Sequence, residues 1–127
     1  MSIMWFDSES KNKNCIATIY DTNITLNKHA AKLIEHAYRV MLGLDYDKKI
    51  LYIRALNKDM ALRGNIALSS QYNISMKSTY ARISNADFVR EIKGILGVDS
   101  LKVNQKKFLV EYQLGSDILT INLNREV

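Results

Sequence analysis

Proline is absent from this chain of 127 residues, cysteine occurs once, and no apolar run approaches the ~20 residues that a membrane-spanning helix needs. The lack of proline excludes a Pro-rich linker or recognition segment. The lone Cys15 has no second thiol for an intramolecular disulfide, which favours a reducing compartment and a half-buried strand position. Residues 1–14 lack the charged start and long apolar core of a signal peptide. We therefore expect a cytoplasmic protein with no membrane partner.

Catalytic and metal-binding motifs are also missing. The sequence contains no G-x-x-x-x-G-K-[ST], G-x-G-x-x-G, G-x-S-x-G or H-E-x-x-H pattern. His29 and His36 lie about two helical turns apart, roughly 10 Å, which is too far for both to bind one metal ion. The turn around Asp45 and Asp47 lacks the glycine and distal glutamate of a calcium loop. The sequence thus predicts a non-enzymatic protein with no metal, no cofactor and no evident small-molecule ligand.

Two segments have the pattern of antiparallel β-hairpins with one apolar face. In residues 108–123, Gly115 and Ser116 form the expected two-residue loop. The predicted cross-strand pairs there are Tyr112 with Leu119, Val110 with Ile121, and Phe108 with Leu123. In residues 38–56 the turn is expected at residues 45–48, and the predicted pairs are Leu42 with Leu51, Val40 with Ile53, and Tyr38 with Ala55.

An amphipathic helix is expected before each hairpin. Asn27 is the predicted N-cap of the first helix, whose apolar stripe comprises Ala30, Ala31, Leu33, Ile34 and Ala37. For the second helix, Ser84 and Asp87 match the S-x-x-D capping box, and Gly97 is the expected stop. Short extended runs precede the helices at residues 15–20, 24–26, 73–76 and 79–83, and residues 57–70 form a connection of weak pattern.

These elements predict an α+β fold in which two antiparallel β-hairpins each follow an amphipathic helix around a shared core. Residues 1–14 would be an N-terminal segment and residues 15–127 a single domain. The halves 15–57 and 71–127 would be an internal duplication, because residues 41–45 match residues 95–99 class by class. Chance is the open alternative, since five common residue types also match at random.

Basic residues flank the start of the second predicted helix. The net charge is +5 and the isoelectric point is near 9.3, which suits an acidic partner such as nucleic acid. The candidate phosphate contacts are Lys77, Arg82, Arg90 and Lys93. The alternative is an ordinary solvent-exposed helix face with ion pairs, because acidic residues alternate with these basic residues. Tyr52 and Arg54 form a second small patch that suits base stacking, or an ordinary solvated strand face.

An apolar cluster near the N-terminus suggests a protein contact. Trp5 and Phe6 precede a polar stretch, and we expect them to bind the core or a partner. Small sheets also leave edges that pairing with a second copy covers, which favours a homodimer. The alternative to DNA binding is therefore a protein–protein interaction or structural module with no nucleic-acid role.

The element order resembles the swapped-hairpin transcriptional regulators of the AbrB and MraZ type. The resemblance rests on CIATIYDTNITLNKHAAKLI with RVMLGLDYDKKILYI, and on the stretch KSTYARISNADFVREIKGILG. It implies a DNA-binding oligomer with basic residues at the strand-to-helix junction. Where those families usually carry G-R-[IV]-x-[IL]-P, this chain reads TNITLN and YARISN, so Arg82 is the only counterpart of the arginine and the proline is missing.

Overall fold

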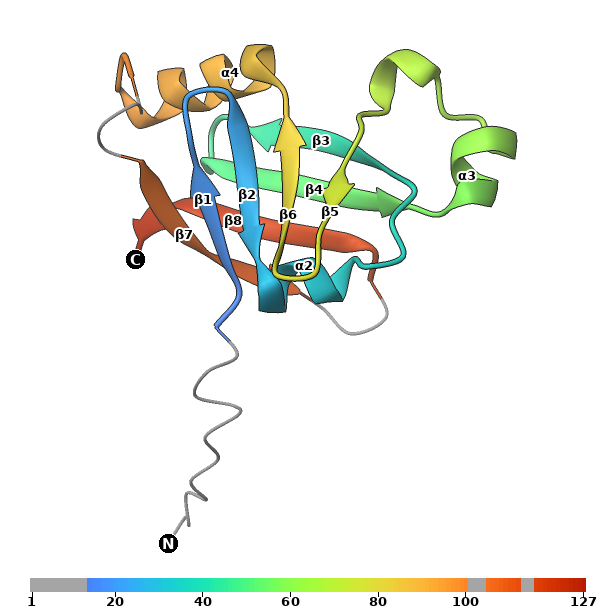
Figure 1. Cartoon of the computed structure of the whole chain (residues 1–127). Coiled ribbons are helices and arrows are strands. Elements are labelled where there is room, and N and C mark those ends of the chain that lie inside the picture. Colours follow the sequence, from blue (N-terminus) through green and yellow to red (C-terminus); the bar gives the residue numbers. More distant parts are fainter. Residues whose placement is uncertain (1–13, 101–104, 113–115) are drawn as a thin grey trace, which may run out of the picture.

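The structure, a computed structural model, describes residues 14–100, 105–112 and 116–127. Eight strands form one sheet in the order β3-β4-β8-β7-β1-β2-β6-β5, and every neighbouring pair is antiparallel (Figure 1). The strands are β1 (Ile16–Ile19), β2 (Asn23–Asn27), β3 (Arg39–Asp45), β4 (Ile50–Leu56), β5 (Ser75–Met76), β6 (Tyr80–Ser84), β7 (Lys106–Tyr112) and β8 (Ile118–Glu126). The helices of the described residues are α2 (Lys28–Leu33), α3 (Lys58–Arg63), the 3-10 turn η1 (Leu68–Ser70) and α4 (Ala86–Leu96).

The predicted fold of two helix-then-hairpin units is wrong. The chain is mostly antiparallel sheet, curled into a half-barrel, with three short helices among the described residues. Four hairpins alternate with the three helices along the chain: β1–β2 precedes α2, β3–β4 lies between α2 and α3, β5–β6 lies between α3 and α4, and β7–β8 follows α4. The physical reason is that hairpin edges carry unpaired backbone groups, which these hairpins satisfy by pairing with one another. Hairpins from residues 15–57 and 71–127 alternate across the sheet.

The sheet curls so that its inner face encloses the core. Val40 and Tyr72 exchange two backbone hydrogen bonds of 2.9 and 2.8 Å, which tie edge strand β3 to the segment before β5 at the opposite edge. Ile92 packs into this core from α4, and most of the largest fully buried side chains lie on the inner face: Phe108, Ile19, Ile24, Leu26, Leu51, Ile53, Ile83, Leu119 and Ile121. Because side chains alternate along a strand, the residues between them point outward and form a separate surface.

Hairpin β7–β8 has the predicted register near its turn. Val110 pairs with Ile121 and Tyr112 with Leu119, which confirms two predicted pairs. Phe108, however, lies opposite Glu126 rather than Leu123, because a bulge shifts the register. The Asn122 side chain accepts a hydrogen bond from the Asn124 backbone N–H at 2.9 Å, a local turn that accommodates the extra residues.

Hairpin β3–β4 was predicted in the wrong register by two residues. Leu42 pairs with Ile53 and Leu44 with Leu51. The cause is Lys49, whose φ of 57° places it in the turn rather than in the strand. A slip of two keeps each strand residue on its face, so the apolar faces within β3 and β4 were predicted correctly. The predicted pair of Tyr38 with Ala55 is wrong, because Val40 pairs with Ala55 and Tyr38 lies before β3, where it is 46% exposed.

Each of the three helices begins at an asparagine at the end of a strand: Asn27 is the last residue of β2, and Asn57 and Asn85 directly follow β4 and β6. The Asn27, Asn57 and Asn85 side chains accept hydrogen bonds from the backbone N–H three residues later, at 3.0, 2.8 and 3.0 Å. Asn27 confirms the prediction, whereas Ser84 is wrong as the second N-cap because the side chain of Asn85, one residue later, accepts the hydrogen bond from the Phe88 backbone N–H. Gly97 ends α4 in the left-handed region, as expected.

Helices α2 and α4 occupy opposite ends of the sheet. They follow β2 and β6, and these strands pair antiparallel, so the strand ends that lead into the helices point in opposite directions (Figure 1). The first helix ends at Leu33 and does not reach Ala37, because the chain turns to start pairing where the Tyr38 backbone N–H donates to the Leu56 carbonyl at 2.8 Å. No helix of the described residues is long and apolar enough to cross a membrane.

Candidate nucleic-acid interface

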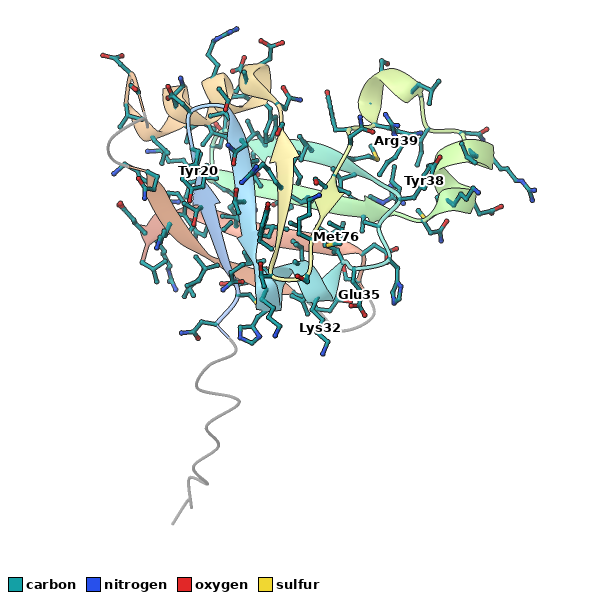
Figure 2. The ribbon with its side chains drawn as sticks, in the orientation of Figure 1. Tyr20, Lys32, Glu35, Tyr38, Arg39 and Met76 are labelled. Carbon is teal, nitrogen blue, oxygen red and sulfur yellow. The ribbon has the colours of Figure 1, made fainter. Side chains whose placement is uncertain are left out.

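Three lysines surround one depression at the α2 end of the sheet, which we call the lysine pocket. It has a volume of about 280 Å³ and lies between α2 and the turn that joins β5 to β6. Its lining residues are Lys28, Ala31, Lys32, Glu35, Met76, Lys77 and Ser78. Figure 2 labels Lys32 on α2, Glu35 in the turn after this helix, and Met76 of β5. Three lysines and one serine thus line a depression that has a single acidic residue in its lining.

Strand pairing explains why these lysines meet. Asn27, the last residue of β2, pairs with Tyr80, the first residue of β6, so the start of α2 lies beside the β5–β6 turn. That turn is closed by a 2.8 Å hydrogen bond from the Lys77 backbone N–H to the Tyr80 carbonyl. The tight turn therefore holds Lys77 beside α2, the helix whose N-cap is Asn27.

A polar row on the outer face of the sheet continues from this pocket. The Arg82 guanidinium lies 5.2 Å from the centre of the Tyr80 ring, a cation–π contact. Paired positions across the strands then bring Ser75, Thr25, Thr18 and Lys107 into the same row as Arg82. Arg82 and Lys107 are exposed in this row, whereas Thr18 is buried and the Thr25 hydroxyl donates to Asn23 Oδ1 at 2.8 Å, so the two cations are the groups of the row that suit phosphates.

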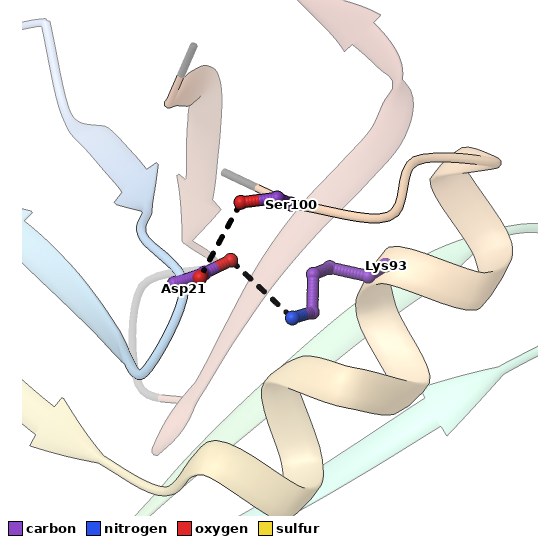
Figure 3. A network of polar contacts seen from close by, with 3 residues as sticks. All are labelled: Asp21, Lys93 and Ser100. Atoms are coloured by element: carbon purple, nitrogen blue, oxygen red, sulfur yellow. Dashed lines mark hydrogen bonds and ion pairs between the residues drawn. The ribbon is translucent and has the colours of Figure 1, made fainter. Parts of the chain in front are cut away.

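The four predicted phosphate contacts do not form one surface. Lys77 and Arg82 lie on the β5–β6 hairpin at the α2 side, whereas Arg90 and Lys93 lie on α4 at the other end. Arg90 pairs with Asp87 at 3.3 Å. Lys93 pairs with Asp21 at 3.3 Å, and the Ser100 hydroxyl donates to the same carboxylate at 3.5 Å (Figure 3).

Lys93 therefore has a structural role that its position explains. Only about a fifth of the Lys93 and Asp21 side chains is exposed, 19% each. The pair joins α4 to the turn between β1 and β2, so the ammonium is directed at the protein and not at solvent. The predicted partner contacts Trp5 and Phe6 lie outside the described residues.

Lys28 and Lys32 were missed by the sequence prediction, although a signal existed. The two residues are one helical turn apart after the N-cap Asn27, which places them on one helix face. A second missed signal is the pattern Y-x-R-x-x-N-x-D, which occurs twice, at residues 52–59 and 80–87. Each copy places a tyrosine and an arginine on the outer face of a strand and an N-cap asparagine at its end.

Other chemistry is sparse in the described part of the chain. No group of three or more His, Cys, Asp or Glu side chains is placed to hold a metal ion there. Burial raises the pKa of the Cys15 thiol, which disfavours the reactive thiolate. No protein-family model, curated protein or solved structure matches this chain.

Proposed function

We propose that this chain is a non-enzymatic nucleic-acid-binding protein that binds DNA through the lysine pocket and the adjoining Arg82. The observation that carries the proposal is the convergence of Lys28, Lys32 and Lys77, from two elements, on one depression. None of these three lysines takes part in an ion pair within the described residues. Cations without protein partners are available to neutralise phosphates and release their counterions.

We also propose a cytoplasmic location for this DNA-binding protein. A cytoplasmic location fits the single, half-buried Cys15, whose raised thiol pKa slows oxidation. The resemblance to AbrB and MraZ regulators and the homodimer stay predictions, and the lysine pocket supports DNA binding without them.

The test is the salt dependence of binding to a fluorescent DNA oligonucleotide, followed by anisotropy. Four cations at this surface predict a slope of log K against log salt near −3 to −4 for duplex DNA, at about −0.9 per phosphate contact. The triple variant K28Q/K32Q/K77Q should lower the magnitude of that slope by about 3 and weaken binding for every DNA sequence.

A matched control keeps the net charge equal. The variant K48Q/K49Q/K58Q also removes three charges, but from the β3–β4 turn and α3, away from the pocket. It should retain most of the slope. Equal losses in the two variants would show that only net charge matters, and an absence of binding at low salt would refute the proposal.

A protein–protein interaction is the second candidate function, and one surface favours it. The segment 58–70 projects from the sheet (Figure 1), and it exposes Leu62 and Leu68 by 59% and 71%. The buried Gln71 holds the segment in shape by donating from Nε2 to the carbonyls of Ala61 and Ile66. If these leucines contact a second copy of the chain, L62S/L68S should lower the mass measured by sedimentation while leaving DNA affinity unchanged. An unchanged mass would count against this candidate.

A further inference from the structure

A groove crosses the outer face of the sheet far from the lysine pocket. It consists of two adjoining hollows of about 420 and 180 Å³ that share Tyr52 and Ile118, which we call the tyrosine groove. The larger hollow is lined by Tyr52, Glu111, Tyr112, Ser116, Ile118 and Thr120, and the smaller one by Met41, Leu42, Gly43, Tyr52, Arg54 and Ile118. Neither hollow belongs to the surface proposed above.

Strand pairing arranges the groove in two parallel rows. Gly43, Tyr52, Thr120 and Glu111 follow one another across β3, β4, β8 and β7, and Met41, Arg54 and Ile118 form the neighbouring row. Opposite faces of these strands are committed to the core, so the two rows are held by a rigid sheet. The groove is thus a preformed surface with an aromatic ring at its centre.

Gly43 leaves space beside the tyrosine. A Cβ atom placed at Gly43 would lie 3.8 Å from the Tyr52 Cβ and 4.0 Å from its Cδ2, in ordinary van der Waals contact. A larger side chain at position 43 would therefore cover this side of Tyr52. The position next to the ring is open, and the apolar side chains of Met41 and Ile118 line the adjoining hollow.

Charged groups stand at both ends of the groove. The Arg54 guanidinium lies 3.9 Å from the Met41 sulfur, and within the described residues no carboxylate pairs with it. Glu111 has no ion pair there either, and its carboxylate stands two strands from Tyr52, about 10 Å between backbones. A flat group on the tyrosine ring would meet a cation on one side and a hydrogen-bond acceptor on the other.

We propose that the tyrosine groove binds one nucleobase of a single-stranded nucleic acid, stacked on Tyr52. The inference rests on the proposed function and names the form of its ligand. Bases are free to stack on an aromatic side chain only when they are not paired in a duplex, and a nearby arginine can meet the phosphate. The Tyr52–Arg54 pair repeats the spacing of Tyr80–Arg82 beside the lysine pocket.

Glu111 selects the base. A carboxylate accepts two parallel hydrogen bonds, and guanine presents two neighbouring donors, N1–H and N2–H, on its Watson–Crick edge. Thymine presents only one donor on that edge. The groove therefore favours guanine over thymine, with the purine spanning the distance between Tyr52 and the Glu111 side chain.

The experiment measures the affinity of a single-stranded thymidine oligonucleotide of about 12 nucleotides with one central guanine, in DNA and RNA form, and of its duplex. Y52L should weaken single-strand binding at least about fivefold and leave duplex binding unchanged. Y52F, which keeps the aromatic ring, should bind single strands with the affinity of the unmodified chain. E111Q should abolish the preference for the guanine oligonucleotide over all-thymidine.

Each outcome decides a different question. If Y52L and Y52F bind single strands like the unmodified chain while K28Q/K32Q/K77Q binds weakly, the tyrosine groove inference is overturned and the proposed function stands. If Y52L and Y52F lose affinity equally, the phenol hydroxyl acts rather than stacking, which also overturns the inference. No binding of either oligonucleotide at low salt overturns both proposals. Y38L, which changes an exposed tyrosine elsewhere, should behave as wild type.

Discussion

Replacing Lys93 by glutamine should lower the stability of the fold without weakening nucleic-acid binding. Lys93 lies on α4 and pairs with Asp21 at 3.3 Å, at the end of the sheet opposite the lysine pocket. Arg90, about one turn earlier on the same helix, pairs with Asp87 at the same distance, so it provides a matched control. The two pairs differ mainly in exposure.

Exposure sets the expected magnitudes. At an effective dielectric constant of 20, two unit charges 3.3 Å apart attract by about 5 kcal/mol, and desolvation of the two groups offsets most of that. With 19% of each side chain exposed, we expect a net coupling of about 1–2 kcal/mol for Lys93 and Asp21. Arg90 and Asp87 are 73% and 88% exposed, so solvent screens their pair to below about 0.5 kcal/mol.

The assay is a pair of double-mutant cycles followed by urea unfolding. One cycle combines D21N with K93Q and the other D87N with R90Q, so that both remove the same kinds of charge. A coupling of 1–2 kcal/mol corresponds to a difference of about 4–8 °C in melting temperature for a domain of this size. Anisotropy with the same DNA oligonucleotide gives the second readout, and K93Q should bind within about twofold of wild type.

Two results would refute the reasoning. A Lys93–Asp21 coupling as small as that of the exposed pair would show that burial does not strengthen this contact. A K93Q variant that folds normally but loses DNA affinity would show that Lys93 contacts the ligand after all, as its sequence position first suggested.

Three further predictions concern single elements. N85A should cost about 1–2 kcal/mol of unfolding free energy because the Phe88 N–H loses its acceptor, whereas S84A should cost less than about 0.5 kcal/mol; equal costs in urea unfolding would contradict the N-cap assignment. G97A should destabilise by about 1 kcal/mol because its φ is 71°, and G94A should stabilise by up to about 1 kcal/mol because its Cβ would meet nothing within 4 Å; the signs are checked by thermal unfolding. The hydrogen bond from Tyr46 to Glu91 raises the pKa of the Tyr46 phenol. Any stability that this hydrogen bond adds is present at neutral pH and is lost as the pH rises through the raised pKa. E91Q should lower the pKa of Tyr46 towards its usual value in an NMR titration, and an unchanged pKa would contradict the contact.

Local structure was largely readable from the amino-acid sequence. Alternating apolar residues assigned the inner faces of β3, β4, β7 and β8, and they did so even where the register of β3–β4 was off by two. Asn27 and Gly97 were recognised as helix ends because their side-chain and backbone chemistry acts within a few residues. Such signals are local, so neighbours in sequence suffice to interpret them.

Only the tertiary structure decided how the hairpins join. Nothing in residues 108–123 specifies that β7 pairs with β1, or that β8 pairs with β4, because backbone hydrogen bonds at a strand edge accept any partner strand. Those pairings turned two expected helix–hairpin units into one curled sheet. These strand pairings also place Lys93 and Lys77 at opposite ends of the sheet and Lys77 beside Lys28, because α2 and α4 follow strands that run in opposite directions. The sequence by itself determined which faces are apolar and how basic the chain is, and long-range strand pairing determined which cations share a surface.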